Sequence, residues 1–227
     1  MKTICIIPAR GGSKRIPRKN IKDFLGKPII AYSIEAALQS NLFDEVMVST
    51  DDAEIAAVAM QYGAKVPFMR SANTANDFAS TEDVLREVLK RYEELGQRFD
   101  LLCCLYATAP FVNPENLQKC YSFIGENYDA SFTMVRYSYP IQRALRIQDG
   151  LIKMRESQYV EARSQDLEPI FHDAGQFYFT LVKDIETLEL WTDHTYGFEL
   201  SELMVQDLDT EIDWKLAEMK YKLLNAE

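Results

Sequence analysis

The stretch TICIIPARGGSKRIPRKN, residues 3–20, begins as a mostly apolar run and continues as a glycine-containing loop rich in positive charge. Residues 3 to 8 are rich in branched side chains, as a strand buried on both faces of a parallel sheet requires. Ligands of open α/β sheets bind at the carboxyl ends of the strands. The loop that follows this strand is therefore in the right place to bind an anion.

Similar apolar runs recur along the first 136 residues, and segments with helical periodicity separate them. The strands are expected at 45–49, 100–106 and 130–136, and the helices at 28–40, 53–62, 81–95 and 114–127. Pro28 fits the first turn of a helix, and Ser80 or Thr81 can cap another. This alternation predicts an α/β fold with a mainly parallel twisted sheet and helices on both faces.

The pattern changes after residue 136. Residues 137–154 are typical of two short strands with a turn at Asp149 and Gly150, which is a hairpin signal. Residues 175–182 then fit a strand that returns to the main sheet, and Thr210 with Asp213 fits the capping box of a final helix. We expect one domain over residues 1–227, with an insertion at about 137–165.

Composition limits the possible partners of the protein. The net charge of −10 and the pI near 4.8 argue against general affinity for nucleic acid or anionic membranes, which would repel the chain at long range. The amino terminus lacks the long apolar segment of a signal peptide or membrane span, so we expect a cytoplasmic protein. The four cysteines show no metal-ligand or redox spacing, and we expect them to be reduced and mostly buried.

The loop after the first strand concentrates positive charge. Residues 1–22 hold seven Lys or Arg and no acid, and Gly11 and Gly12 let the backbone approach a ligand closely. A solvated surface loop is the alternative, but a triphosphate explains the local excess of cations better. Neither GxxxxGK[ST] nor GxGxxG occurs, so the loop belongs to another class of nucleotide-binding site.

An acidic segment lies near the other end of the chain. Residues 199–213 contain six acids and no base. In an extended segment Asp207 and Asp209 point the same way while Leu208 faces the core, and such a pair suits Mg²⁺. The alternative is that the two aspartates are solvated residues of the segment before the helix that Thr210 caps. Of Asp51 and Asp52, one is expected to cap a helix, and either could support a metal site.

Several segments together resemble the acylneuraminate cytidylyltransferase family, whose members activate nine-carbon acidic sugars. They are IIPARGGSKRIPRKNI at 6–21, VSTDD at 48–52, DFAST at 77–81 and QDLDTEIDW at 206–214, and the resemblance runs from residue 3 to about 220. YATAPF at 106–111 and RSQDLEPIFHDAGQFYF at 163–179 look most like the pseudaminic acid branch. Compared with the sialic acid branch, Tyr106 replaces a glutamine, Val112 an arginine and Ala174 an asparagine, which argues against N-acetylneuraminate as the sugar.

The resemblance implies a role for each of a set of residues. The nucleotide would contact Arg10, Gly11, Gly12, Lys14, Lys19, Asn20, Arg70 and Ser80, and Asp207 and Asp209 would hold Mg²⁺. The sugar would contact Tyr106, Arg163, Gln176, Phe177 and His172. Asp209, Lys19 and Arg10 are the expected catalytic residues. His172 is expected to hydrogen-bond the sugar rather than act in the chemistry, and His194 to lie on the surface.

The resemblance also implies a reaction and an assembly. The anomeric hydroxyl of the sugar acid, expected to be pseudaminic acid, would attack the α-phosphorus of CTP and release pyrophosphate, supplying a CMP-sugar for flagellin or surface glycans. Mg²⁺ would bridge the phosphate and the attacking oxygen; the proton acceptor is left open. The insertion resembles a dimer arm, so a homodimer is expected. Alternatives are CMP-N-acetylneuraminate or CMP-legionaminate synthesis, a nucleotide-binding protein without turnover, and an NAD dehydrogenase, which the missing GxGxxG opposes.

Overall fold

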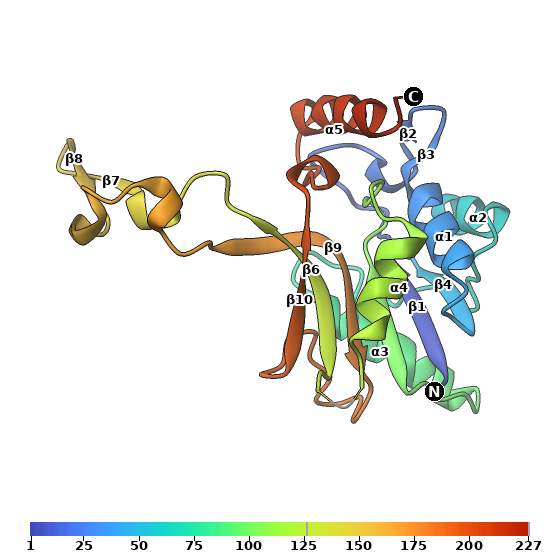
Figure 1. Ribbon diagram of the computed structural model, residues 1–227. Helices are drawn as coiled ribbons and strands as arrows, with labels where there is room; N and C mark the ends of the chain where they lie inside the picture. Colours follow the sequence, from blue (N-terminus) through green and yellow to red (C-terminus); the bar gives the residue numbers. More distant parts are fainter. Residues whose placement is uncertain (126, 227) are drawn as a thin grey trace.

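The computed structural model describes residues 1–125 and 127–226 and is built around a six-stranded sheet (Figure 1). Its strand order is β10-β6-β9-β5-β1-β4. Strand β1 pairs in parallel with β4 and β5, and β10 pairs in parallel with β6, whereas β9 runs antiparallel between β5 and β6. The bounds are β1 Thr3–Pro8, β4 Glu45–Ser49, β5 Leu101–Leu105, β6 Ala130–Arg136, β9 Phe171–Leu181 and β10 Thr195–Leu200.

Helices cover both faces of this sheet because alternate strand residues point to opposite sides. On one face Cys5, Cys103 and Leu105 pack in one cluster with residues of α1, α2 and α4. On the other face Ile6 and Cys104 pack against α3. The bounds are α1 Ile29–Ser40, α2 Ala53–Gln61, α3 Thr81–Glu94 and α4 Pro114–Ser122. All four cysteines are free and buried, as expected.

A third apolar cluster joins the two ends of the chain. Ile16 of the cationic loop is fully buried with Phe24, Leu208 and Trp214. Trp214 lies on α5 (Glu211–Leu224), whose first turn carries the capping box predicted for Thr210 and Asp213. The cationic loop is therefore packed against the segment that carries Asp207 and Asp209. Short elements complete this region: η1 Lys19–Ile21, β2 Asp23–Phe24, β3 Lys27–Pro28 and η5 Glu202–Met204.

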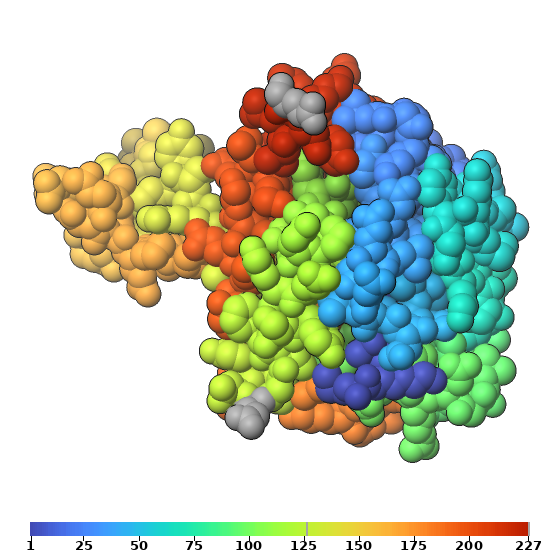
Figure 2. Space-filling model, turned by 45° about the vertical axis from the view of Figure 1, so that its right-hand side comes forward, coloured from blue at the N-terminus to red at the C-terminus, as the bar shows by residue number. Residues whose placement is uncertain are grey.

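The insertion between β6 and β9 projects away from the body as an arm, defined here as residues 137–170 (Figures 1 and 2). It contains the antiparallel hairpin of β7 (Leu145–Gln148) and β8 (Leu151–Met154). Asp149 and Gly150 form its turn with φ of +52° and +76°, which confirms the turn predicted there. Short helical turns flank the hairpin: η2 Ile141–Arg143, η3 Ser157–Tyr159 and η4 Ser164–Asp166.

The structure confirms the predicted fold class and most of the predicted elements. One helix is shorter than expected: α4 ends at Ser122, whereas the prediction extended it to residue 127. Residue 126 of that prediction lies outside the described residues. Pro28 precedes α1 as its N-cap instead of lying in the first turn. Within the described residues, no helix combines the length and apolar character that crossing a membrane demands.

Candidate functional site

The cationic loop leaves β1 at its carboxyl end and opens onto a cavity of about 480 Å³. The cavity walls come from four parts of the chain: the loop itself, residues 70–80, the amino end of α3 and the segment after β5. The lining residues that the argument below uses are Arg10, Lys14, Arg15, Lys19, Asn20, Arg70, Asp77, Ser80, Thr81 and Tyr106. The structure thus brings most residues predicted to bind the nucleotide to one cavity.

Two cations of the loop share a carboxylate that the sequence reasoning missed. Arg10 donates to Asp77 Oδ1 at 2.6 Å, and Lys14 donates to Asp77 Oδ2 at 2.5 Å. These hydrogen bonds lower the pKa of Asp77, with Lys14 the larger cause. Asp77 lies in the quoted DFAST motif, but 67 and 63 positions along the chain separate it from the two cations, so no sequence signal indicated this pairing.

The basic and acidic ends of the chain meet at this site. Arg15 donates to Asp209 Oδ2 at 2.5 Å, and Lys19 Nζ donates to the carbonyl of Leu208 at 2.8 Å. Burial lowers the pKa of Lys19, while the charges of Asp209 and Asp207 partly offset that effect. The cationic loop is therefore in direct contact with the segment that carries the two aspartates, although neither aspartate lines the cavity itself.

The carboxylate pair could bind a metal ion only if water or phosphate oxygens supplied the remaining ligands. Leu208 is buried between the two aspartates, as the alternation of an extended segment requires. Within the described residues, no cluster of three or more His, Cys, Asp or Glu is placed to hold a metal ion. Mg²⁺ commonly takes one or two carboxylates and completes its shell with water and phosphate oxygens, so two aspartates beside a phosphate site fit this ion.

Asp51 and Asp52 fix the beginning of the loop. Asp52 caps α2 by accepting from the amides of Glu54 and Ile55, and Asp51 accepts from the Gly11 amide at 2.9 Å. A Cβ on residue 11 would lie 2.8 Å from Asp52 Oδ2, so the backbone needs glycine there. A Cβ on Gly12 would meet nothing within 4 Å. Neither glycine is among the residues that line the cavity, and their contact with the nucleotide stays a prediction.

The residues predicted to contact cytidine lie on the cavity wall, and hydrogen bonds to the protein hold each of them in place. The buried Asn20 donates to the carbonyl of Arg10 at 2.9 Å. The buried Arg70 donates to the carbonyl of Ser49 at 2.6 Å, and burial lowers its pKa. Ser80, one of the two predicted caps, is the N-cap of α3 and forms a capping box with Asp83. The amino end of α3, a helix of 14 residues, thereby adds a partial positive charge to the cavity.

The predicted sugar-binding residues are not all together. Tyr106 lines the cavity, whereas Gln176 is buried and donates to the carbonyl of Met204 at 2.5 Å. Arg163 lies exposed on the arm, paired with Asp166 at 2.8 Å. His172 is exposed beside Tyr137, with ring centroids 4.7 Å apart.

Phe177 requires a correction. Its side chain is fully buried and its ring lies 5.9 Å from that of Phe179, so it packs in the core and does not reach the cavity. The reason is the alternation along β9: Phe177 and Phe179 share the face of Leu105 and Cys103, whereas Tyr178 lies on the opposite face with Tyr106. Tyr178 was missed, although the period of two was a signal for it.

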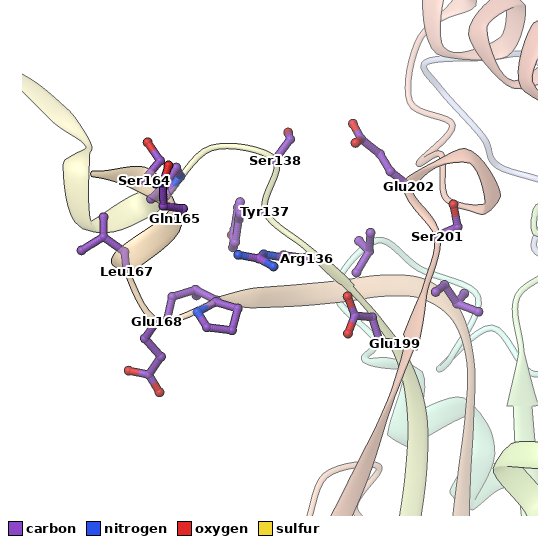
Figure 3. Close-up of a pocket in the computed structure, with 15 residues that line it drawn as sticks. Arg136, Tyr137, Ser138, Ser164, Gln165, Leu167, Glu168, Glu199, Ser201 and Glu202 are labelled. Atoms are coloured by element: carbon purple, nitrogen blue, oxygen red, sulfur yellow. The ribbon is translucent and has the colours of Figure 1, made fainter. Parts of the chain in front are cut away.

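A second cavity of about 420 Å³ lies where the arm leaves the body (Figure 3). Arg136 and Tyr137 line it from the end of β6, and Glu199 and Glu202 line it from the region of β10. Ser164, next to Arg163, also belongs to its wall. Three of its lining residues are glutamates and only one is a cation, so its charge does not suit a triphosphate.

The mainly parallel sheet with a cationic cavity at its carboxyl edge defines a nucleotide-binding α/β protein. The chain matches the cytidylyltransferase family model over residues 4–218 and belongs to that family. It is 46% identical to the pseudaminic acid cytidylyltransferase of Campylobacter jejuni subsp. jejuni, covering 98% of this chain and 97% of the relative. It is 34% identical to the CMP-N,N'-diacetyllegionaminic acid synthase of Legionella pneumophila, covering 100% and 99%.

A solved structure supports the fold independently. The CTP complex of CMP:2-keto-3-deoxy-manno-octonic acid synthetase superposes with a TM-score of 0.70 at 20% identity, over the whole of both chains. At this identity the likeness establishes the fold alone.

Proposed function

We propose that this protein transfers the cytidylyl group of CTP to pseudaminic acid, giving the CMP-sugar and pyrophosphate. The observation that carries the proposal is the meeting of Arg15 with Asp209 and of Lys19 with Leu208 at one cavity. The relative named for this activity covers nearly the whole chain, so the complete domain is shared with it.

In this proposal the protein acts mainly through charge and position. The anomeric hydroxyl of the sugar acid forms the new bond to the α-phosphorus, and the bond to pyrophosphate breaks. Arg10, Lys14 and Lys19 would neutralise the charge that builds up on the departing pyrophosphate. Asn20, Arg70 and Ser80 would orient the cytidine. The triphosphate would replace Asp77 as the partner of Arg10 and Lys14.

Asp207 and Asp209 are the residues that would hold Mg²⁺. When bound there, the ion would supply charge neutralisation for the phosphates and would make the sugar hydroxyl more acidic. Arg15 pairs with Asp209 in the present structure and would then be free to turn toward a phosphate oxygen. This arrangement predicts that CTP and the ion bind together.

We also propose a homodimer formed through the arm. One face of the β7–β8 hairpin presents Leu145, Ile147 and Ile152, which are 64%, 80% and 71% exposed. A two-stranded hairpin is barely stable alone in water, so this apolar face needs a cover. A second exposed apolar row lies on α5, at Ile212, Leu216, Met219 and Leu223, with the spacing of one helix face. A second copy could cover both surfaces and bring a partner arm near the sugar.

The four free thiols are consistent with a cytoplasmic location.

The test is release of pyrophosphate from CTP and Mg²⁺ with a panel of pseudaminic, legionaminic and N-acetylneuraminic acids. We expect the highest kcat/KM with pseudaminic acid and no turnover in excess EDTA. A preference for legionaminic acid would move the proposal to that substrate, and no turnover with any sugar would favour a binding protein.

A further inference from the structure

A carboxylate of the protein itself occupies the place that the proposed function gives to phosphate. Arg10 donates to Asp77 Oδ1 at 2.6 Å, and Lys14 donates to Asp77 Oδ2 at 2.5 Å. All three side chains line the cationic cavity. Lys14 and Arg10 lower the pKa of Asp77, so this carboxylate is ionised at neutral pH. A phosphate group that binds these two cations therefore competes with an anion that is already there.

The tip of the wall segment that carries this carboxylate, residues 76–79, lies on the surface. Its two flanks are anchored to α3, because Ser71 donates its amide and its hydroxyl to Glu87 at 2.8 and 2.9 Å and Ser80 is the N-cap of the helix. None of the residues of the tip is buried, and Phe78 is 97% exposed. An anion that binds the two cations can therefore displace the tip without uncovering apolar core.

The cost of displacing Asp77 falls only on ligands that place phosphate at Arg10 and Lys14. CTP and pyrophosphate carry the two terminal phosphates that would bind there, whereas CMP lacks them. Exposed ion pairs are individually weak, so this cost lowers the affinity by a small factor and does not prevent binding. It also favours the departure of pyrophosphate after the reaction, because Asp77 can form both of its ion pairs again as the product leaves.

We propose that Asp77 is an internal competitor for the terminal phosphates of CTP, which weakens the binding of CTP and of pyrophosphate and so speeds the release of pyrophosphate. This inference rests on the proposed function and adds a role in product release to it. The opposite role, in which holding Arg10 and Lys14 in place outweighs the competition, would make Asp77 strengthen the same binding. The sign of the effect of Asp77→Asn separates the two roles.

Calorimetry with CTP, pyrophosphate and CMP, each with Mg²⁺ and without sugar, measures the competition without turnover. We expect Asp77→Asn to lower the Kd of CTP and of pyrophosphate about fivefold, the scale of two exposed ion pairs, and to leave the Kd of CMP within about twofold. Glu94→Gln is the matched control, because it removes one charge from an exposed acid at the end of α3, outside the cavity. This control should bind all three ligands as the wild type does.

A double variant tests whether the effect depends on the cations. Because Asp77 acts by occupying Arg10 and Lys14, Asp77→Asn should lower the Kd of CTP less in a Lys14→Ala protein than in the wild type. In steady-state kinetics, Asp77→Asn should make product inhibition by pyrophosphate about fivefold stronger.

Three results would overturn the competition: unchanged or weaker binding of CTP and pyrophosphate in Asp77→Asn, equal tightening of all three ligands, or the same gain with and without Lys14. Failure of the wild type to turn over any sugar would instead overturn the proposed function. The binding of CTP and pyrophosphate would still decide the role of Asp77, because these titrations need no sugar.

Discussion

The carboxylate of Asp77 lies between Arg10 and Lys14, where a triphosphate would place its oxygens. Its side chain is 44% exposed, and ion pairs this exposed contribute little to stability. A triphosphate carries more charge and offers several acceptor oxygens to the same two cations. The pairing with Asp77 therefore holds the cations in place and would not prevent the proposed binding of the nucleotide.

Lys14→Ala should weaken CTP binding much more than sugar binding. The side chain of Lys14 hydrogen-bonds Asp77 in the present structure. Its loss would remove one charge-assisted contact to phosphate, which should raise the KM for CTP on the order of tenfold. Lys22→Ala is the matched control, because Lys22 pairs with Glu211 outside the cavity. Steady-state kinetics with each substrate varied would measure the two constants. A larger effect on the sugar would misplace the triphosphate.

Asp209→Asn should lower kcat at least ~100-fold, the scale on which one preorganised electrostatic group contributes. In calorimetry, Mg²⁺ should strengthen CTP binding less in the variant than in the wild type, because the variant lacks one of the two carboxylates proposed to hold the ion. Glu211→Gln is the control, since this exposed acid two residues further on pairs with Lys22. Near-normal turnover of Asp209→Asn with Mg²⁺ would remove this carboxylate from the reaction.

At the scale of single elements, local patterns were enough to predict the buried strands, three of the helix starts or caps, and the hairpin turn. The register shift between β6 and β9 was not predicted, because it depends on pairing across a long sequence separation. The positions of Phe177 and Tyr178 follow from that pairing and from the strand's alternation. The family resemblance pointed to Phe177, but the faces of the sheet separate its ring from that of Tyr178.

The N-cap of α2 also anchors the cationic loop. Arg18 adopts φ of +55° and pairs with Asp52 at 2.5 Å and with Glu54. Hydrogen bonding to Arg18 is the largest cause that lowers the pKa of Asp52, from 3.8 to about 2. The carboxylate therefore stabilises the folded state fully above its unfolded pKa, and this contribution is lost as the pH falls toward 2.

Asp52→Asn should reduce the free energy of unfolding at neutral pH, and the difference from the wild type should shrink as the pH falls from about 4 toward about 2. Asparagine caps helices about as well as aspartate, so the variant removes the charge and keeps the cap. Urea unfolding at several pH values would measure the difference. A difference that stays constant down to the lowest pH would show that Asp52 contributes through its shape and not its charge.

At the scale of the whole molecule, the arm exposes apolar side chains that the body does not cover. The main sheet and its helices bury their own apolar faces, whereas the hairpin exposes most of one face to solvent. Sequence patterns predicted the hairpin but not its distance from the body, which Figures 1 and 2 show. Its exposed apolar face is the observation behind the proposed homodimer.

Ile147→Lys should therefore shift the protein from dimer toward monomer, from about twice 26.1 kDa to 26.1 kDa in sedimentation velocity. Ile147 lies opposite Ile152 on the apolar face, and a charge there would be buried without a partner in the dimer. Gln148→Lys adds the same charge on the other face and should leave the dimer intact. If both proteins sediment as the wild type does, the hairpin face is not the interface. If the wild type itself is a monomer at micromolar concentration, the arm needs another partner.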